Sequence, residues 1–406
     1  PVEVAVVTGG PEVADRLTSL PFDHLVFTGS ATVGKLVMAN AAKNLVPVTL
    51  ELGGKSPQIV FEDADIEAFV PIACKAIVQN TGQTCSAGSR LLIQQSIYDD
   101  VVAEVVRSGL VESRHRGTAV RVDPDGQTVW SIGDPGTVVF PRSTNKPFQA
   151  AGLVREGLDL EPRLLALAAA SHSAEPFHLE GVREILARGD LDESALQTPP
   201  SYPVDPHEHA AVLRAGEGRL PIRMDCSGKH AAMLLTCVQR GWSTHDYLDP
   251  DHPVQRAITA TFTELVGPPD VVGVDGCGAP LLATSLERLA RGVGRLMRAE
   301  PGSAERRVAD AMVAHPEQVS GTRRPDLALA RAVPGSLVKS GAESVVVAGL
   351  ADGSALAVKI EDGGERPLFV VLHRALELAG VDADLLRERP VVLGGGRPVG
   401  EVRPVL

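Results

Sequence analysis

The sequence has no long hydrophobic segment, few cysteines and no cluster of basic residues. No run reaches the roughly 18 apolar residues that a membrane-spanning helix needs, and residues 1–30 show no basic segment followed by an apolar one. Five cysteines are too few for a disulfide scaffold and are typical of a reducing compartment. A net charge of -12 without a basic run argues against nucleic-acid or membrane partners. We therefore expect a cytoplasmic protein.

The composition is typical of a folded, globular protein. Hydrophobic residues make up 44% and charged residues 22%, which excludes a disordered chain. At ~100 to 200 residues per domain, the length of 406 residues predicts two or three domains. The apolar patterns predict a mixed α/β (α+β) protein. Strands are expected at 47–51, 57–61, 344–348 and 368–372, and helices at 162–170, 181–188 and 254–266.

The basic residues divide the chain into two parts. Residues 1–110 contain four lysines and three arginines, whereas residues 111–406 contain four lysines and twenty-eight arginines. We predict two domains, 1–110 and 111–406, with the junction in the stretch 105–113. The chain begins with Pro1 rather than Met. Together these features suggest a gene fusion or a misjoined reading frame.

Three motifs in the first part place reactive or anion-binding groups in loops of small residues. FTGSATVG, at 27–34, is a Gly/Ser turn that follows an apolar run and precedes a helix-like segment. Such a turn suits a phosphate, although an ordinary helix cap or turn has the same pattern. Glu51 in LELGGKSP and Cys85 in GQTCSAGSR are a carboxylate and a thiol flanked by Gly and Ser. A thiolate nucleophile needs such access and a nearby base.

In order and spacing, these motifs resemble the aldehyde dehydrogenase superfamily. The resemblance implies that Gly29, Ser30 and Gly34 line the pyrophosphate of NAD, that Glu51 activates water and that Cys85 attacks the aldehyde. It covers only residues 1–107, so the first strands of the dinucleotide fold and the oxyanion-hole asparagine are lacking. We expect a remnant to which NAD does not bind productively. An NAD(P)-dependent aldehyde dehydrogenase is kept as an alternative function.

A fragment of this kind lacks the surfaces that cover it in a complete enzyme. We expect apolar residues of the first part to be exposed and the part to be sensitive to proteolysis. Cys74 lies on an apolar, helix-like face and is expected to belong to the core of this part.

The second part carries two serine–lysine combinations. Ser143 and Lys146 in FPRSTNKPFQA have the Ser-x-x-Lys spacing, which puts both side chains on one face of a helical turn. A desolvated, neutral lysine can accept the serine proton, although the spacing alone also fits a plain helix-face pair. Further along the chain, Ser171 lies in SHSAEPFH and Lys339 in SLVKSGAES, and two serines with two lysines suggest a paired Ser–Lys centre. The latter motif resembles the Lys-Ser/Thr-Gly strand of serine β-lactamases and penicillin-binding proteins.

Two further cysteines of the second part lie in Gly-rich turns. Cys226 belongs to RMDCSGKHAAM and Cys277 to GVDGCGAP. Thiols in such turns ligate a soft cation such as zinc, or are simply structural. Because two cysteines leave a tetrahedral site incomplete, His230 or a deprotonated Lys229 is the candidate third ligand, with water as the fourth. Cys237, in an apolar helix-like segment, is expected in the core.

Six motifs of the second part together resemble the L-asparaginase II family, the thermolabile, rhizobial-type asparaginases. They are SRHRG, FPRSTNKPFQA, SHSAEPFH, DCSGKHA, DGCGAP and LVKSGAES, and the resemblance covers nearly all of 112–406. It implies a fold like that of serine β-lactamases and serine-dependent glutaminases, hydrolysis of the small molecule L-asparagine to L-aspartate and ammonia, and a homodimer. It also implies two Ser–Lys tandems, Ser143 with Lys146 and Ser171 with Lys339, with Ser143 as the nucleophile.

The same resemblance implies a zinc site and a set of substrate-binding residues. Cys226, Lys229 and Cys277 would hold the metal, Asp275 would contact substrate or metal-bound water, and Arg142 and His230 would lie beside the substrate. One departure is Asp225, where family members commonly have Asn; this carboxylate changes the charge beside Cys226 without removing a ligand. The alternatives are another Ser-x-x-Lys acyl transferase of the penicillin-binding type, and a pseudoenzyme inactivated by the fusion.

Overall fold

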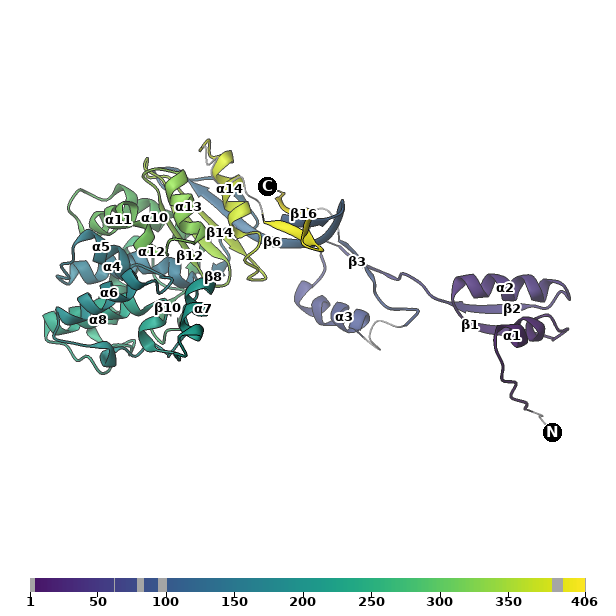
Figure 1. Ribbon diagram of the computed structural model, residues 1–406. Coiled ribbons are helices and arrows are strands. Elements are labelled where there is room, and N and C mark those ends of the chain that lie inside the picture. Colours follow the sequence, from purple (N-terminus) through teal and green to yellow (C-terminus); the bar gives the residue numbers. More distant parts are fainter. Residues whose placement is uncertain (1–3, 62, 79–83, 94–100, 382–389, 406) are drawn as a thin grey trace. The chain divides into compact units, whose positions relative to one another are not determined.

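The computed structural model divides the chain into two compact units, Pro1–Asp99 and Asp100–Leu406. It describes residues 4–61, 63–78, 84–93, 101–381 and 390–405. Both units mix helices and strands, as the sequence predicts (Figure 1). Among the described residues, no helix combines the length and the apolar character that crossing a membrane requires.

The first unit consists of short elements joined in two small parallel sheets. Strand β1 pairs with β2, and β3 pairs with β4. The strands expected at 47–51 and 57–61 are present as β2 and β3. The elements are α1 (Pro11–Thr18), β1 (Leu25–Gly29), α2 (Ala31–Ala42), β2 (Val48–Leu52), β3 (Pro57–Val60), α3 (Ile66–Val78) and β4 (Arg90–Ile93).

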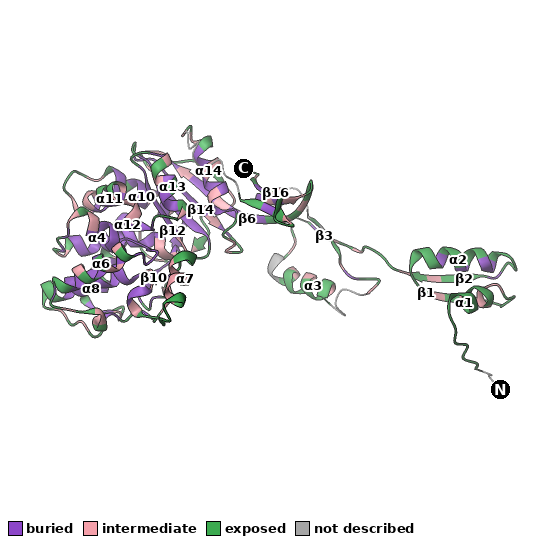
Figure 2. Ribbon diagram, viewed as in Figure 1, coloured by how far each residue is buried: buried purple, intermediate pink, exposed green. Residues whose placement is uncertain are grey.

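Two-stranded sheets leave much of this unit's apolar surface in contact with solvent, as expected from the sequence. Val26 is 69% exposed, Ile72 is 64% exposed and Phe61 is 61% exposed. Figure 2 shows that exposed residues predominate along α1, α2 and α3. Cys74 on α3 is also exposed, so its expected place in a core is wrong. An apolar helix face becomes a core only where another element covers it.

The second unit is built on an eight-stranded sheet. The strands follow the order β12-β13-β14-β6-β5-β16-β15, with β7 also paired to β6. These pairs are antiparallel. The members are β5 (Val101–Arg107), β6 (Leu110–Val122), β7 (Thr128–Ile132), β12 (Leu337–Gly341), β13 (Val345–Gly349), β14 (Ala355–Ile360), β15 (Val391–Gly394) and β16 (Arg397–Pro404).

The stretch 105–113, where the sequence predicts the junction, lies within the second compact unit. That stretch forms the hairpin of β5 and β6, whose turn contains Ser108 and Gly109 with φ angles of 48° and 83°. The two compact units separate after Asp99 instead. The sequence of this stretch does not indicate strands, because bulges shift the register of the β5–β6 pair twice and obscure the two-residue period.

Helices cover both faces of this sheet. Along β13, Val345 and Val347 face the larger core, whereas Val346 and Ala348 face the smaller one, as the two-residue period of a strand requires. Cys237 lies in the larger core, as expected. Helices around the larger core are α4 (Lys146–Arg155), α5 (Pro162–Ala168), α6 (Pro176–Ala187), α8 (Ser227–Arg240), α9 (Pro253–Leu265), α10 (Leu286–Arg298) and α11 (Ala304–Ala314); α13 (Pro325–Ala332) and α14 (Leu368–Leu378) contribute to the smaller core.

The expected helices are found as α5, α6 and α9, and the strand expected at 344–348 is β13. The strand expected at 368–372 is wrong, because these residues begin helix α14. The buried positions Leu368, Val371, Leu372, Ala375 and Leu376 recur at helical spacing. A short continuous apolar run does not distinguish a buried strand from a buried helix, and only the longer window shows the period.

The position of β5 inside the sheet makes the domain boundary testable. We expect limited proteolysis of the full chain to leave a stable fragment that begins near residue 101. A chain starting at residue 111 lacks β5, which pairs with both β6 and β16 and buries Ala103 and Val105 completely. Its melting temperature should be lower than that of a chain starting at residue 101 by about 5 °C or more. Equal melting temperatures would place the boundary after β5.

Candidate active site

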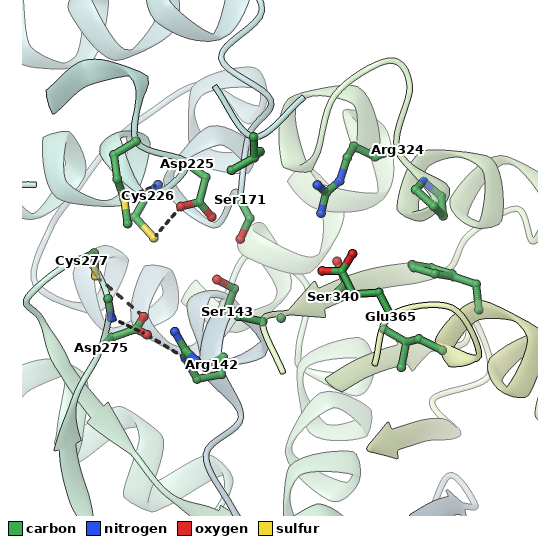
Figure 3. A pocket seen from close by; sticks show the side chains of 18 residues that line it. Arg142, Ser143, Ser171, Asp225, Cys226, Asp275, Cys277, Arg324, Ser340 and Glu365 are labelled. Atoms are coloured by element: carbon green, nitrogen blue, oxygen red, sulfur yellow. Dashed lines mark hydrogen bonds and ion pairs between the residues drawn. The ribbon is translucent and has the colours of Figure 1, made fainter. Parts of the chain in front are cut away.

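A cavity of about 410 Å³ in the second unit gathers residues that are far apart in the sequence. In Figure 3, Cys226, Asp275 and Cys277 lie at one end, Ser143 and Ser171 in the middle, and Arg324, Ser340 and Glu365 at the other end. The lining residues are Arg142, Ser143, Ser171, Val204, Met224, Asp225, Cys226, Asp275, Gly276, Cys277, Arg324, Pro325, Ser340, Gly341, Ala342, Glu365, Leu368 and Phe369.

Ser143 occupies a short turn of 3-10 helix, Arg142–Asn145, that leads into α4. Arg142 has a φ angle of 50°, a backbone conformation that is energetically costly for any residue other than glycine. A side-chain hydrogen bond fixes this turn to β10 (Pro280–Leu282), because Asn145 Nδ2 donates to the carbonyl of Leu282 at 3.1 Å. Ser143 lines the cavity, and within the described part of the chain its hydroxyl makes no hydrogen bond. This hydroxyl is therefore accessible to a bound molecule.

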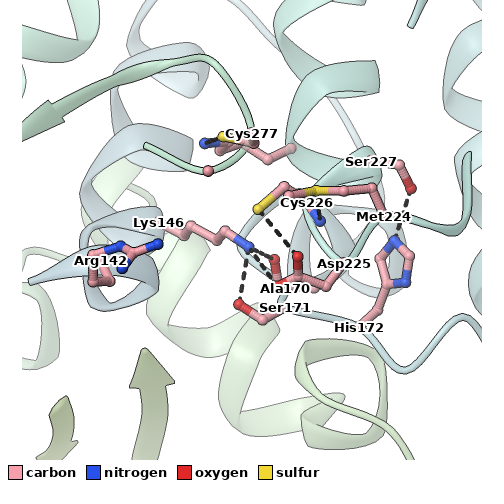
Figure 4. Close-up of polar contacts among 12 residues, drawn as sticks. Arg142, Lys146, Ala170, Ser171, His172, Met224, Asp225, Cys226, Ser227 and Cys277 are labelled. Atoms are coloured by element: carbon pink, nitrogen blue, oxygen red, sulfur yellow. Dashed lines mark hydrogen bonds and ion pairs between the residues drawn. The ribbon is translucent and has the colours of Figure 1, made fainter. Parts of the chain in front are cut away.

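Lys146 binds Ser171 rather than Ser143. Its buried Nζ donates to Ser171 Oγ at 2.9 Å and to the carbonyl oxygen of Ala170 at 2.6 Å, and lies 3.8 Å from Asp225 Oδ2 (Figure 4). The Ser-x-x-Lys spacing predicts both side chains on one face of a helical turn; Ser143 lies in the 3-10 turn and Lys146 begins α4. The spacing fixes only the direction of the Cβ atoms. The long lysine side chain reaches the loop that packs beside α4.

Lys339 lies on the edge strand β12 and is fully buried. Its Nζ donates a 2.5 Å hydrogen bond to the carbonyl of Ser340, so the predicted pairing with Ser171 is not present as a hydrogen bond. Burial lowers the pKa of Lys339 to about 7, with further lowering by the charges of Lys146 and Arg324 and an opposing contribution from Asp326. Near neutral pH this amine is therefore present in both protonation states.

Gly341 allows β12 to approach the turn that carries Ser143. A Cβ atom at this position would lie 2.9 Å from the carbonyl oxygen of Pro141 and 3.0 Å from the backbone nitrogen of Ser143. These separations are too short for a methyl group against backbone atoms, so the small residue of the Lys-Ser-Gly motif is needed for this contact.

The residues that follow Ser171 hold its loop in place. His172 Nε2 lies 2.8 Å from Ser227 Oγ, which itself donates to the carbonyl of Ile222. The network therefore assigns the Nε2–H tautomer to His172, whose Nδ1 accepts from the backbone of Ala174. Burial lowers the pKa of His172 well below its usual range, so the ring is neutral. His172 thus fixes the Ser171 loop against the start of α8.

The thiol end of the cavity comes from two local structures. The tip of the hairpin of β9 (Val272–Val274) and β10 (Pro280–Leu282) carries Asp275 and Cys277, and Cys226 immediately precedes α8. One ligand atom each from Cys226, Asp275 and Cys277 lies within 4.8 Å of the others. Lys229, in the first turn of α8, donates from Nζ to Cys277 Sγ at 3.2 Å. The predicted metal ligands are therefore gathered together, with Asp275 as an additional oxygen donor.

The charges of this end are interdependent. A hydrogen bond from Cys226 and the charge of Lys229 lower the pKa of Cys277 far below that of an ordinary thiol, despite its burial. The same hydrogen bond, together with burial, raises the pKa of Cys226. Burial alone would lower the pKa of Lys229, but the charges of Cys277, Cys226 and Asp275 raise it. The pair therefore contains one thiolate, and Lys229 carries the balancing charge.

Arg142 and Asp275 neutralise each other across the same end. Arg142 Nε donates to Asp275 Oδ1 at 2.9 Å, and the same oxygen accepts from the backbone of Gly276. Both side chains line the cavity.

His230, which the resemblance places beside the substrate, is not among the residues that line the cavity. It is fully buried in α8, where Nδ1 forms a 2.8 Å hydrogen bond with Tyr247 Oη. Its Nε2 has no hydrogen-bond partner among the described residues, and burial lowers the pKa of the ring. His230 follows Cys226 by one helical turn. The sequence therefore predicts that it lies near the thiols, but not whether its ring faces the cavity.

Arg324 and Glu365 were not singled out from the sequence, although both line the cavity. Arg324 belongs to the segment TRRPD, in which nothing distinguishes it from Arg323, and Glu365 lies in a polar loop before α14. Neither position carries a local motif. A charged residue at a cavity wall is recognisable only once the chain segments around it are assembled.

In the first unit, the turn FTGSATVG makes contacts typical of an ordinary helix start. Gly29 ends β1, and Ser30 caps α2 by accepting a hydrogen bond from the backbone of Val33 at 3.2 Å. Gly34 is buried in α2, where a Cβ atom would lie 2.8 Å from Leu52 Cδ2. These contacts account for the three small residues through helix capping and packing.

Glu51 and Cys85 are both exposed in this unit. The loop after Glu51 approaches the cysteine, because Ser56 Oγ donates to the carbonyl of Cys85 at 3.4 Å and a Cβ atom on Gly54 would lie 3.1 Å from the same oxygen. The two motifs are therefore adjacent.

Comparisons with known proteins separate the two parts. Residues 1–111 match the aldehyde dehydrogenase family. The chain is 45% identical over 105 residues to 4,4'-diaponeurosporen-aldehyde dehydrogenase of Staphylococcus aureus, covering 26% of this chain and 23% of that protein. It is 45% identical over 107 residues to the dimeric NADP-preferring aldehyde dehydrogenase of Mus musculus, covering 25% and 23%. The chain thus spans about a quarter of the length of these curated relatives.

Among solved structures, the NAD+ complex of an aldehyde dehydrogenase from Bacillus cereus is 44% identical, with 22% of this chain and 18% of that chain covered and a TM-score of 0.21. Residues 103–404, in contrast, match the family described as L-asparaginase II. This match contains the whole cavity and extends over most of the chain. The chain therefore belongs to the L-asparaginase II family, and it carries a segment of the aldehyde dehydrogenase family before the asparaginase part.

Proposed function

We propose that the second unit hydrolyses L-asparagine to L-aspartate and ammonia. One observation supports the proposal above others: in a chain of the L-asparaginase II family, two serines line one cavity and two buried lysines lie directly beside it. Serine hydroxyls are weak nucleophiles unless a base accepts their proton, and a buried amine is such a base.

Ser143 is the proposed nucleophile, because its hydroxyl is accessible and not engaged in a hydrogen bond among the described residues. Its Oγ attacks the carbon of the side-chain amide while a neighbouring amine accepts the hydroxyl proton. The carbon–nitrogen bond then breaks, the proton passes to the departing nitrogen, and ammonia leaves. Water hydrolyses the resulting ester on Ser143 and releases L-aspartate.

Lys339 and the Lys146–Ser171 pair are the proposed proton carriers. Lys339 has a pKa of about 7 because it is buried, so its neutral form is available near neutral pH. Ser171 is hydrogen-bonded to Lys146 at 2.9 Å and faces the same part of the cavity as Ser143 (Figure 3). This pair can pass a proton along its hydrogen bond. The two Ser–Lys tandems would then act as one connected group.

The negative charge that develops on the amide oxygen needs hydrogen-bond donors. The backbone N–H of Ser143 is our candidate, because it lies in the first turn of its 3-10 helix, where N–H groups lack partners within the helix. Gly341 leaves room beside this N–H.

A zinc ion fits the thiol end of the cavity. The donor set of Cys226, Cys277 and Lys229, with Asp275 in reach, combines the soft thiolate ligands that zinc prefers with a nitrogen and an oxygen donor. We propose that these residues hold zinc, for which Lys229 must lose its proton. When bound, the ion would supply positive charge beside the substrate amide.

The edge strand β12 beside the helix that carries Ser143 supports the proposed similarity to serine β-lactamases, in which a Lys-Ser/Thr-Gly strand accompanies the Ser-x-x-Lys helix. A homodimer and a cytoplasmic location stay predictions. An acyl transferase of the penicillin-binding type remains the rival within this fold. Aldehyde oxidation by the first unit remains the rival outside it, on the match to aldehyde dehydrogenases.

Replacing Ser143 tests the nucleophile. We expect the full chain to release ammonia from L-asparagine, and Ser143→Ala to lower kcat by about 10³-fold or more, because the variant lacks the hydroxyl that forms the ester intermediate. Ser201→Ala, a half-buried serine outside the cavity, is the matched control and should retain full activity. NAD-dependent oxidation of propanal, measured in parallel, should be absent. Ammonia release by Ser143→Ala at the original rate would exclude this nucleophile.

The low pKa of Lys339 predicts a pH dependence. Below pH 7 the amine is protonated and cannot accept a proton, so kcat/KM should rise with pH and level off above about 7. Lys146, Arg324, Asp326 and Asp225 are the charged groups that act on Lys339. Lys339→Arg keeps the positive charge at all pH values, so we expect it to lower kcat/KM by about 10²-fold or more and to abolish this limb. An unchanged pH profile in the variant would assign the limb to another group.

Metal analysis tests the zinc site without recourse to activity. We expect the purified chain to contain about one equivalent of zinc, and Cys226→Ser and Cys277→Ser each to weaken zinc binding by about 10²-fold or more. Cys85→Ser, an exposed thiol of the first unit, is the matched control and should keep the metal content unchanged. Equal zinc content in all three variants would contradict the assignment.

A further inference from the structure

Arg324 lies at the end of the cavity opposite the thiols (Figure 3). Its side chain makes no ion pair or hydrogen bond among the described residues, and its Nε is buried without a hydrogen-bond partner. A buried N–H without an acceptor is unfavourable and is rare in native structures. In Figure 3 the guanidinium points into the cavity. An anionic group of a bound molecule would satisfy it.

The chain on both sides of Arg324 is firmly held. Before it, Arg323 binds both carboxylate oxygens of Asp205 at 3.1 Å and Glu208 at 2.5 Å. After it, Asp326 Oδ1 accepts from the backbone of Ser340 at 2.9 Å. The two neighbouring arginines therefore differ. Arg323 is paired with carboxylates of the protein, whereas Arg324 lines the cavity and has no such pair among the described residues.

Glu365 supplies the opposite charge at the same end. It lines the cavity, and Figure 3 shows its carboxylate directed toward the space that Arg324 also faces. Within the described residues its side chain has no ion pair or hydrogen bond. The cavity's other charged residues are already paired, Arg142 with Asp275 at 2.9 Å and Asp225 with Lys146 at 3.8 Å. Arg324 and Glu365 are therefore the charges of this cavity that remain available to a ligand.

We propose that Arg324 binds the α-carboxylate of the substrate and Glu365 binds its α-ammonium group. The inference rests on the proposed asparaginase function and adds the residues that recognise the amino-acid head group. In L-asparagine the carboxylate and the ammonium group are both attached to Cα, and the carbon of the reacting amide is two bonds from Cα. A head group held at this end directs the amide toward Ser143 and Ser171 in the middle of the cavity. Arginine suits the carboxylate because its planar fork donates two parallel hydrogen bonds.

Truncated ligands separate the two contacts. Succinamate has the carboxylate without the ammonium, and β-alaninamide has the ammonium without the carboxylate. In the Ser143→Ala background, which prevents turnover, Kd is measured by calorimetry for both compounds and for L-asparagine. Arg324→Gln should weaken L-asparagine and succinamate by about 30-fold or more and leave β-alaninamide within about twofold. Glu365→Gln should weaken L-asparagine and β-alaninamide in the same way and leave succinamate unchanged.

Arg366→Gln, an exposed neighbour outside the cavity, is the control for a loss of charge and should bind all three compounds as the parent does. If the wild-type chain hydrolyses L-asparagine while Arg324→Gln and Glu365→Gln bind every compound equally well, the head-group assignment is wrong and the proposed function stands. If the wild-type chain releases no ammonia and its Ser143→Ala variant binds no L-asparagine, the proposed function itself fails. A uniform loss of affinity for all three compounds in either variant would indicate a distorted cavity and would also overturn the assignment.

Discussion

The burial of three lysine ammonium groups around one cavity is the constraint on which the site depends. Lys146, Lys229 and Lys339 are among the largest fully buried side chains of the protein. Removing such a group from water is unfavourable unless partners compensate or its proton is lost. Lys146 is compensated by Ser171 and the Ala170 carbonyl, and Lys229 by the Cys277 thiolate. Lys339 has a weaker set of partners, and its pKa falls to about 7.

This constraint also explains how the charges are distributed along the cavity. At the thiol end, each charge is neutralised by a neighbour, which leaves the sulfur atoms close together and suited to a soft cation. In the middle, Ser171 is hydrogen-bonded to the buried amine of Lys146. At the far end, Arg323 is fixed by ion pairs, while Arg324 and Glu365 have no ion pair within the part of the chain that the structure describes. The proposed substrate, a zwitterion with an amide at its other end, would complement that order of charges.

Much of the secondary structure followed from apolar periodicity, and the two units show where that information ends. The helices α5, α6 and α9 and the strands β2, β3 and β13 were predicted from short windows. The region 368–372 was not, because its first five residues are uniformly apolar and the helical period appears only over the whole of α14. The same apolar patterns occur in both units. They form a core in the second, where helices cover an eight-stranded sheet, and stay exposed in the first, where each sheet has two strands.

The sequence by itself determined the family, the reactive residue types and the motifs that carry them, because Ser-x-x-Lys, Lys-Ser-Gly and the two cysteine turns are local patterns. Tertiary structure alone decided which groups meet. It paired Lys146 with Ser171, placed His230 behind the cavity, and added Asp275 to the thiols. It also distinguished Arg324 from Arg323, two adjacent and chemically identical residues. Contacts of this kind depend on the packing of distant segments, and a lysine or arginine side chain is long enough to reach several alternatives from one backbone position.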